Sequence, residues 1–324
     1  MFLWSGDCPV SAIELPRLGM GTATIGNLYA AVSDEQARAT VAEAWAAGIR
    51  YFDNKQEDFH AIYGAMNSFV LMLNDAKHRR IRNFISGAWH DKDRLANAPM
   101  DEAVAKSGVL VVAIDMRNSH EAPYPASVQD ASYGVRWLKT KARDWKGDPS
   151  HLGLLGSSSG GHVAELLAMR PRDRRYNEIP MAGAPDLDAT VAYVATRSPI
   201  SDCHARYEHM VKTDRPEMIK KSKMYFDPWE SIFEGNPMLI LERGEKVTLP
   251  PLLIMQGELD TNVPWQIQEK FGKLYRAAGG ECQVEVFEGC EHQWINDPGP
   301  QTTRAHEMLK AFIAQQLGAL RKAA

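Results

Sequence analysis

The sequence predicts an α/β protein built on a doubly wound, mostly parallel sheet. From residue 83 onward, short apolar runs alternate with longer amphipathic stretches. This order is expected when each strand of a parallel sheet is followed by a helix that packs on one of its faces. The run Leu110–Ile114 is also apolar at every position, as in a strand that is buried on both sides.

The expected elements follow one another in a regular order after residue 83. Strands are predicted within residues 83–89, 108–117, 151–157, 189–200, 250–260 and 282–289. Helices are predicted within residues 101–106, 125–145, 159–169 and 302–323. Residues 203–246, rich in Met, Tyr, Trp and charge, fall between two of these strands, and we interpret them as a lid insertion.

The first 80 residues follow a different pattern. Residues 13–54 are predicted as an atypical β-α-β segment, in which Ser33 and Gln36 form a capping box and Gly48 ends the helix. Residues 61–76 have helical periodicity, and the basic cluster at 77–82 is interpreted as solvated. We therefore divide the chain into an N-terminal fragment with its connector, 1–80, and a main domain, 81–324.

Composition excludes several classes of partner and site. The 324 residues carry a formal net charge of -4, which gives no electrostatic reason to expect nucleic acid or an anionic membrane. No apolar run approaches bilayer length, and the N-terminus lacks the basic start and long apolar run of a secretory signal. The four cysteines form no CxxC pair and lack metal-finger spacing. We expect reduced thiols, no metal, and a cytoplasmic protein.

The pattern G-x-S-x-G at Gly156–Gly160 lies between an apolar strand and a helix. A nucleophilic serine needs a tight turn from strand to helix to expose its oxygen, and small residues on both sides prevent the backbone from crowding itself. The N-terminus of the helix offers amides and a positive dipole end to an oxyanion. We predict Ser158 as nucleophile and the amide of Ser159 as an oxyanion donor; an ordinary Gly/Ser turn is the alternative.

Two later residues complete this pattern in the expected order. Asp260 comes directly after an apolar strand and is followed by a turn with Pro264. Of the ten histidines, His292 is the one placed in the loop after the next strand and before the last helix. We predict that His292 acts as general base and that Asp260 orients its imidazole.

Residues 83–320 resemble the alpha/beta-hydrolase superfamily, in the branch of hormone-sensitive-lipase-like and acetyl-esterase-type carboxylesterases. The stretches "VVAIDMRNSHEAPYPASVQDASYGVRWLK", "DPSHLGLLGSSSGGH", "GELDTNVP" and "EGCEH" carry this resemblance. It implies hydrolysis of an acyl ester through an acyl-enzyme, without metal or cofactor. Our leading hypothesis is a carboxylic ester of small or medium size that is hydrophobic or aromatic.

The chain departs from that family in one loop. Relatives carry His-Gly-Gly before Ala-Trp, and the amides of this loop complete the oxyanion hole. Here Ile85 and Ser86 stand where the histidine and first glycine would be. We expect Gly87 and Ala88 still to offer amides, while Ile85 cannot make the polar contacts of a histidine.

Aromatic side chains near these loops are candidates for a substrate pocket. Trp89, Trp229 and Trp294 are the predicted substrate-binding residues, together with Tyr225 and Phe226 in the insertion. Ordinary packing of the core and of the insertion is the alternative for each of them.

Residues 15–54 resemble the beginning of an aldo-keto reductase instead. "LGMGT", a helix and "AGIRYFD" follow in that family's order, and Asp53 stands at the position of its catalytic aspartate. The resemblance stops after Asn54, and two or three elements cannot close a barrel. We interpret the fragment as structural: it completes the sheet, caps the pocket or mediates homodimer contacts.

Four functions remain open at this point. The first is a serine carboxylesterase acting on a small-molecule ester, and the second is an amidase, formamidase or peptidase that uses the same three residues. The third is a weakened hydrolase fold that serves as a binding module, suggested by the altered oxyanion loop. The last is an NADP-dependent reductase, which the missing barrel disfavours.

Overall fold

A computed structural model of the chain describes residues 20–21, 52–53, 69–75, 88–90, 97–145 and 147–323. Its centre is a six-stranded sheet in the order β4-β3-β5-β6-β7-β8, in which every neighbouring pair is parallel. The strands are β3 (Phe69–Asp75), β4 (Leu110–Met116), β5 (Leu152–Ser157), β6 (Tyr193–Arg197), β7 (Leu252–Gly257) and β8 (Cys282–Phe287). The predicted parallel α/β fold is confirmed.

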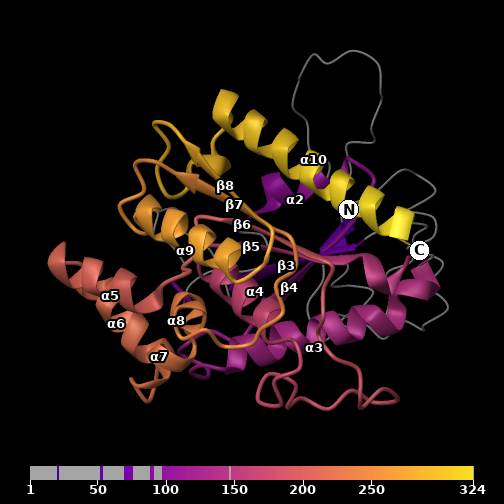
Figure 1. The fold of residues 1–324 in the computed structure, drawn as a ribbon, viewed down its shortest axis with the longest axis horizontal. Helices are drawn as coiled ribbons and strands as arrows, with labels where there is room; N and C mark the ends of the chain where they lie inside the picture. The colour runs from indigo at the N-terminus through magenta and orange to yellow at the C-terminus, as the bar shows by residue number, and fades with distance from the viewer. Residues whose placement is uncertain are drawn as a thin grey trace.

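Helices cover both faces of this sheet, as Figure 1 shows. One face packs against α3 (Ala126–Lys141), α4 (Ser159–Met169), α8 (Pro237–Glu242) and α9 (Trp265–Ala277). The other face packs against α2 (Ala98–Ala105) and α10 (Pro300–Ala323). Short 3-10 turns η2 (Ala142–Trp145), η3 (Pro149–His151) and η4 (Trp294–Asn296) join these elements.

Alternation along the strands separates two hydrophobic cores. In β4, Leu110, Val112 and Ile114 belong to the core under α3 and α4, whereas Val111 and Ala113 belong to the core under α2 and α10. Successive side chains of a strand point to opposite faces, so a strand covered on both sides must be apolar throughout. This is why the uninterrupted apolar run predicted a buried strand correctly.

The stretch between β6 and β7 forms four helices that cluster at one side of the molecule (Figure 1). They are α5 (Cys203–Lys212), α6 (Pro216–Tyr225), α7 (Ser231–Glu234) and the core-packing α8. This helical insertion coincides with the range 203–246 expected from the sequence. Whether it opens and closes as a lid stays a prediction.

The helical periodicity of residues 61–76 was misleading for residues 69–75, which form strand β3. β3 pairs with β4 on one side, where Phe69 faces Leu110, and with β5 on the other, where Phe69 faces Leu152. Pairing along both edges overrides a local pattern that cannot distinguish a short apolar strand from a helix. β3 precedes residue 81, so the sheet includes chain that the sequence analysis assigned to the connector; the division at 81 itself stays a prediction.

Near the N-terminus, the structure describes two short parallel strands, β1 (Met20–Gly21) and β2 (Phe52–Asp53). Met20 pairs with Phe52 and Gly21 with Asp53, which agrees with the two strands of the predicted β-α-β segment. They form a two-stranded sheet of their own. The helix expected between them, the basic cluster at 77–82 and the strand expected at 83–87 lie outside the described residues.

Within the described part of the chain, no helix combines the length and apolar character needed to cross a membrane.

Candidate active site

Ser158 occupies a sharp turn between β5 and α4. Its φ of 55° and ψ of -118° are unusual for a residue other than glycine, and such strain typically persists where the surrounding structure enforces it. A Cβ atom on Gly156 would lie 2.4 Å from the carbonyl oxygen of Gly160, so no larger residue fits there. The amide of Ser158 donates to the carbonyl of Arg197 over 2.9 Å, which ties the turn to the end of β6.

The three predicted catalytic side chains meet at the carboxyl edge of the sheet. Oγ of Ser158 lies 2.9 Å from Nε2 of His292, and Nδ1 of His292 lies 2.7 Å from Oδ2 of Asp260. They come from the loops after β5, β8 and β7, which a parallel sheet brings together at one edge. Gly257 at the end of β7 lets the histidine loop approach, because a Cβ there would lie 2.5 Å from the carbonyl oxygen of Cys290.

The carboxylate of Asp260 is held by its own loop as well as by His292. Oδ1 accepts hydrogen bonds from the backbone amides of Asn262 and Val263, both at 2.8 Å. Oδ2 accepts a further hydrogen bond from Nε2 of Gln256 at 2.9 Å. These donors leave the carboxylate one orientation, with Oδ2 directed at the imidazole. Gln256 lies inside an apolar strand, and that misplaced polar residue was the sequence signal for its role.

The surroundings of Asp260 and His292 favour an ionised carboxylate and a neutral imidazole. Burial by itself raises the pKa of Asp260, but His292 and the hydrogen bonds from Val263 and Gln256 bring the pKa below its ordinary value. Burial lowers the pKa of His292, and the charges of Arg197 and Arg206 lower it further, against the opposing effect of Asp260. A neutral His292 that donates Nδ1–H to Asp260 presents Nε2 as an acceptor for the Ser158 hydroxyl.

Two buried arginines contact the loops that carry His292 and Asp260, and neither was identified from the sequence. Arg197, at the end of β6, donates from Nη1 to the carbonyl oxygen of His292. Arg206, on α5, donates to Oδ1 of Asn262 from Nη2 over 2.6 Å. Burial lowers the pKa of each guanidinium to about 10, so both stay charged at neutral pH.

Of the predicted oxyanion donors, two lie in described parts of the chain. Ser159 is the first residue of α4, where helix amides have no partner within the helix. Ala88 begins a turn in which Ala88 and Trp89 have φ values of 40° and 61°. The carbonyl of Trp89 accepts from the amide of Ser119 over 2.8 Å, which fixes this turn beside β4. Gly87, Ile85 and Ser86 lie outside the described residues, so the composition of the hole stays a prediction.

Trp89 packs inside a cluster of rings, with only 1% of its surface exposed. Its ring stacks on Tyr225 at a centroid distance of 4.5 Å and an interplanar angle of 6°, and Phe226 meets it edge-on. Its Nε1 donates to Nδ1 of His162 over 3.1 Å. These contacts agree with the alternative that Trp89 is part of the packed core, and not part of the wall of a substrate pocket.

The other two predicted pocket tryptophans also pack against rings. Trp229, partly buried in the insertion, lies 4.5 Å from the ring of Tyr207. Trp294, 8% exposed, stacks on Phe287 at 4.5 Å and belongs to the core under α2 and α10. A substrate-binding role for either one stays a prediction.

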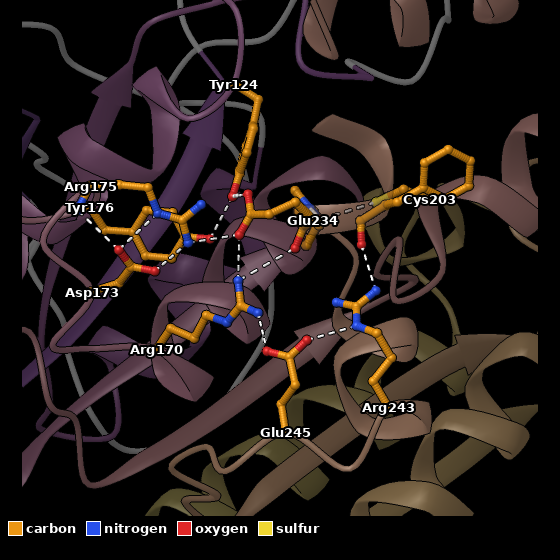
Figure 2. Close-up of polar contacts among 12 residues, drawn as sticks. Tyr124, Arg170, Asp173, Arg175, Tyr176, Cys203, Glu234, Arg243 and Glu245 are labelled. Carbon is orange, nitrogen blue, oxygen red and sulfur yellow. Dashed lines mark hydrogen bonds and ion pairs between the residues drawn. The ribbon is translucent and has the colours of Figure 1, made fainter. Parts of the chain in front are cut away.

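A network of charges ties the insertion to the main domain (Figure 2). Glu234, the last residue of α7, accepts hydrogen bonds from Tyr124 and from Nη1 of Arg170, the latter at 2.5 Å. Arg175 pairs with the same carboxylate at 2.8 Å, and Arg170 also pairs with Glu245 beyond α8. The neighbouring Gly235 is therefore held in place as well.

Sequence and structure comparisons place this fold among known hydrolases. The sequence model of the BD-FAE family matches residues 74–274. The chain belongs to the BD-FAE family. A probable isoprenylcysteine alpha-carbonyl methylesterase of Oryza sativa subsp. japonica is 24% identical over 78% of the chain and 62% of its own length. LipM of Mycobacterium tuberculosis, a probable carboxylic ester hydrolase, is 24% identical over 56% of the chain and 41% of its own length. The chain thus spans about half of these curated relatives.

Solved structures support the same fold. A hyperthermophilic esterase from the archaeon Pyrobaculum calidifontis superimposes with a TM-score of 0.62 at 18% identity, over 79% of each chain. A truncated carbohydrate esterase from gut microbiota gives a TM-score of 0.58 at 21% identity, over 78% of this chain and 86% of that one. The expected alpha/beta-hydrolase fold is confirmed, whereas the resemblance of residues 15–54 to aldo-keto reductases stays untested.

Proposed function

We propose that this protein is a serine esterase that hydrolyses small to medium-sized carboxylic esters through an acyl-enzyme. The observation that carries the proposal is the hydrogen-bonded chain from Ser158 through His292 to Asp260, with distances of 2.9 and 2.7 Å. Membership in the BD-FAE family and relatives named as esterases support it.

In the proposed mechanism, Oγ of Ser158 attacks the ester carbonyl while its proton passes to Nε2 of His292. Asp260 stabilises the imidazolium, and the amide of Ser159 at the start of α4 donates to the oxyanion. The tetrahedral intermediate collapses and the alkoxide leaves as an alcohol, taking the proton from His292. His292 then deprotonates a water molecule that attacks the acyl-serine, and the carboxylic acid product leaves as the proton returns to Ser158.

A panel of p-nitrophenyl esters and p-nitroanilides, run on the wild type and on Ser158→Ala, tests this function. We expect ester turnover that disappears in Ser158→Ala. Turnover that persists in the variant would contradict the assignment of Ser158. Anilide turnover at a similar rate would favour the amidase alternative, in which His292 protonates an amine leaving group instead.

The hydrophobic or aromatic character of the ester, a cytoplasmic location and a homodimer also belong to this proposal. Trp89, Trp229 and Trp294 all pack against other rings, so these contacts do not by themselves indicate an aromatic substrate.

For the N-terminal fragment we propose a structural role within the same folded protein. Deletion of residues 1–54 should then give insoluble or poorly stable protein. A soluble truncated protein with full esterase activity would contradict that role.

A further inference from the structure

Arg206 lies where the insertion meets two loops of the candidate active site. It is 1% exposed, and Nε and Nη2 both donate to Oδ1 of Asn262, at 3.1 and 2.6 Å. Its guanidinium carbon lies 5.7 Å from the centre of the Trp89 ring. Asn262 is two residues beyond Asp260 and Trp89 directly follows Ala88, so the guanidinium lies between the acid loop and the oxyanion side.

No carboxylate among the described residues forms an ion pair with Arg206. The two nearby acids have other partners: Asp260 is held by its own loop and by His292, while Asp202 caps α5 through the amide of Ala205. The guanidinium therefore has hydrogen bonds to a neutral amide oxygen, a weak contact with a methionine sulfur and the face of an indole ring. Nη1 donates to none of the residues that the structure describes.

Arg206 is a buried cation that is not paired with either of the two carboxylates near it. Arg197 and Arg206 are both 1% exposed, and the carboxylates of Asp260 and Asp202 are both hydrogen-bonded to other groups. A buried charge is costly unless a partner compensates it. Among the described residues the Arg206 guanidinium thus has no anionic partner, and an anionic group of a bound ligand would compensate its charge.

We propose that Arg206 binds a carboxylate carried by the ester substrate, so that the preferred substrates are esters with a second, ionised carboxyl group. A guanidinium presents its N–H donors in a planar fork that matches a carboxylate, and Nη1, which donates to none of the described residues, supplies such a donor. This inference rests on the proposed esterase function and narrows it to anionic esters.

A matched pair of substrates tests the inference: p-nitrophenyl hemiglutarate, which carries a carboxylate, and p-nitrophenyl hexanoate, which is neutral and of similar length. For the wild type we expect kcat/KM to be about tenfold higher for the hemiglutarate, the usual scale of one charged hydrogen bond. This ratio should fall to one or below in Arg206→Met and be retained in large part in Arg206→Lys.

Lys212→Met is the matched control. Lys212 is an exposed lysine of α5, the helix that carries Arg206, so its loss changes the net charge equally without touching the buried site. The preference for hemiglutarate should be unchanged in this variant. A preference that falls as far in Lys212→Met as in Arg206→Met would overturn the inference, because surface charge would then explain it.

The two proposals fail in different ways. If the wild type hydrolyses neither ester, the proposed function is wrong. If the wild type hydrolyses hexanoate but does not prefer hemiglutarate, or if Arg206→Met keeps the preference, the role of Arg206 is wrong and the esterase function stands.

Inhibition of the wild type gives a second test that needs no variant. Glutarate should inhibit hexanoate hydrolysis at a concentration about tenfold lower than butyrate, because its second carboxylate reaches Arg206. Equal inhibition by the two acids would mean that the second carboxylate of glutarate adds nothing to binding. That result would overturn the inference.

Discussion

Trp89 donates its indole N–H to Nδ1 of His162, and this bond joins the turn after Ala88 to the helix that begins directly after Ser158. On its other side, His162 donates Nε2–H to the carbonyl oxygen of Gly235 over 2.7 Å. One neutral imidazole therefore connects the turn at Ala88 and Trp89, the helix that follows Ser158 and the insertion. The sequence carried a signal for this residue, since position 162 lies one helical turn after position 158.

The buried His162 should make stability fall in acid. Burial lowers its folded pKa from 6.5 to about 4, so the unfolded chain takes up a proton between these values and the folded protein does not. This contribution to stability is complete above pH 6.5 and is lost as the pH falls towards 4, by about 3 kcal/mol. Urea unfolding of the wild type and His162→Gln at several pH values measures it. The stability difference between the two proteins should shrink in acid; parallel profiles would contradict this account.

The pH dependence of catalysis should report His292. Because its pKa lies below the ordinary value and the neutral form is the base, kcat/KM should fall on the acid side only below pH 6.5. Arg197→Met removes one of the cations that lower this pKa, so the acid limb of the kcat/KM–pH profile should move to higher pH. Arg304→Met, on the exposed side chain that pairs with Glu285, is the control and should leave the limb in place. An unmoved limb in Arg197→Met would show that its charge does not act on His292.

Replacement of the orienting acid should affect catalysis more than binding. Asp260→Asn retains the shape of the side chain but removes the charge that stabilises the imidazolium and selects its tautomer. We expect kcat to fall by about 10³–10⁴ with little change in KM, the scale seen when this group is lost in other serine hydrolases. Asp148→Asn, which alters a half-exposed cap of a 3-10 turn, should leave both constants unchanged. Steady-state kinetics on one neutral ester decides between these outcomes.

The network at Glu234 should stabilise the attachment of the insertion. Glu234→Gln weakens the pairing with Arg170 and Arg175 seen in Figure 2, and we expect the free energy of unfolding to fall by about 1–3 kcal/mol. Glu102→Gln removes a single exposed ion pair of 3.5 Å to Lys106 and should cost less than about 0.5 kcal/mol. Equal losses in the two variants would mean that the network acts as an ordinary surface pair.

The sequence predicted most of the sheet, and it identified three side chains that the structure brings together, because these depend on local patterns. The strands β4, β5 and β7 are readable as short, largely apolar runs bounded by turn residues. Ser158, Asp260 and His292 follow strand ends in the expected order. β3 was missed because its seven residues are too few for periodicity to separate strand from helix.

The supporting residues could not be predicted in the same way. Arg197 and Arg206 resemble surface arginines in the sequence, and only the packing of β6 and α5 buries them beside His292. The aromatic residues were identified as a group, but their assignment to pocket or core depends on ring contacts between distant segments, such as Trp89 and Tyr225.

Labelling with a fluorophosphonate tests the central claim most directly, since the reagent reacts with a serine only when a neighbouring base activates its hydroxyl. The account predicts one phosphonylated residue per chain, located at Ser158 by peptide mass spectrometry, with no label in Ser158→Ala and little in His292→Ala. A folded wild-type protein that takes up no label, or a label that persists in Ser158→Ala, would contradict the claim that Ser158, His292 and Asp260 form a working hydrolase site.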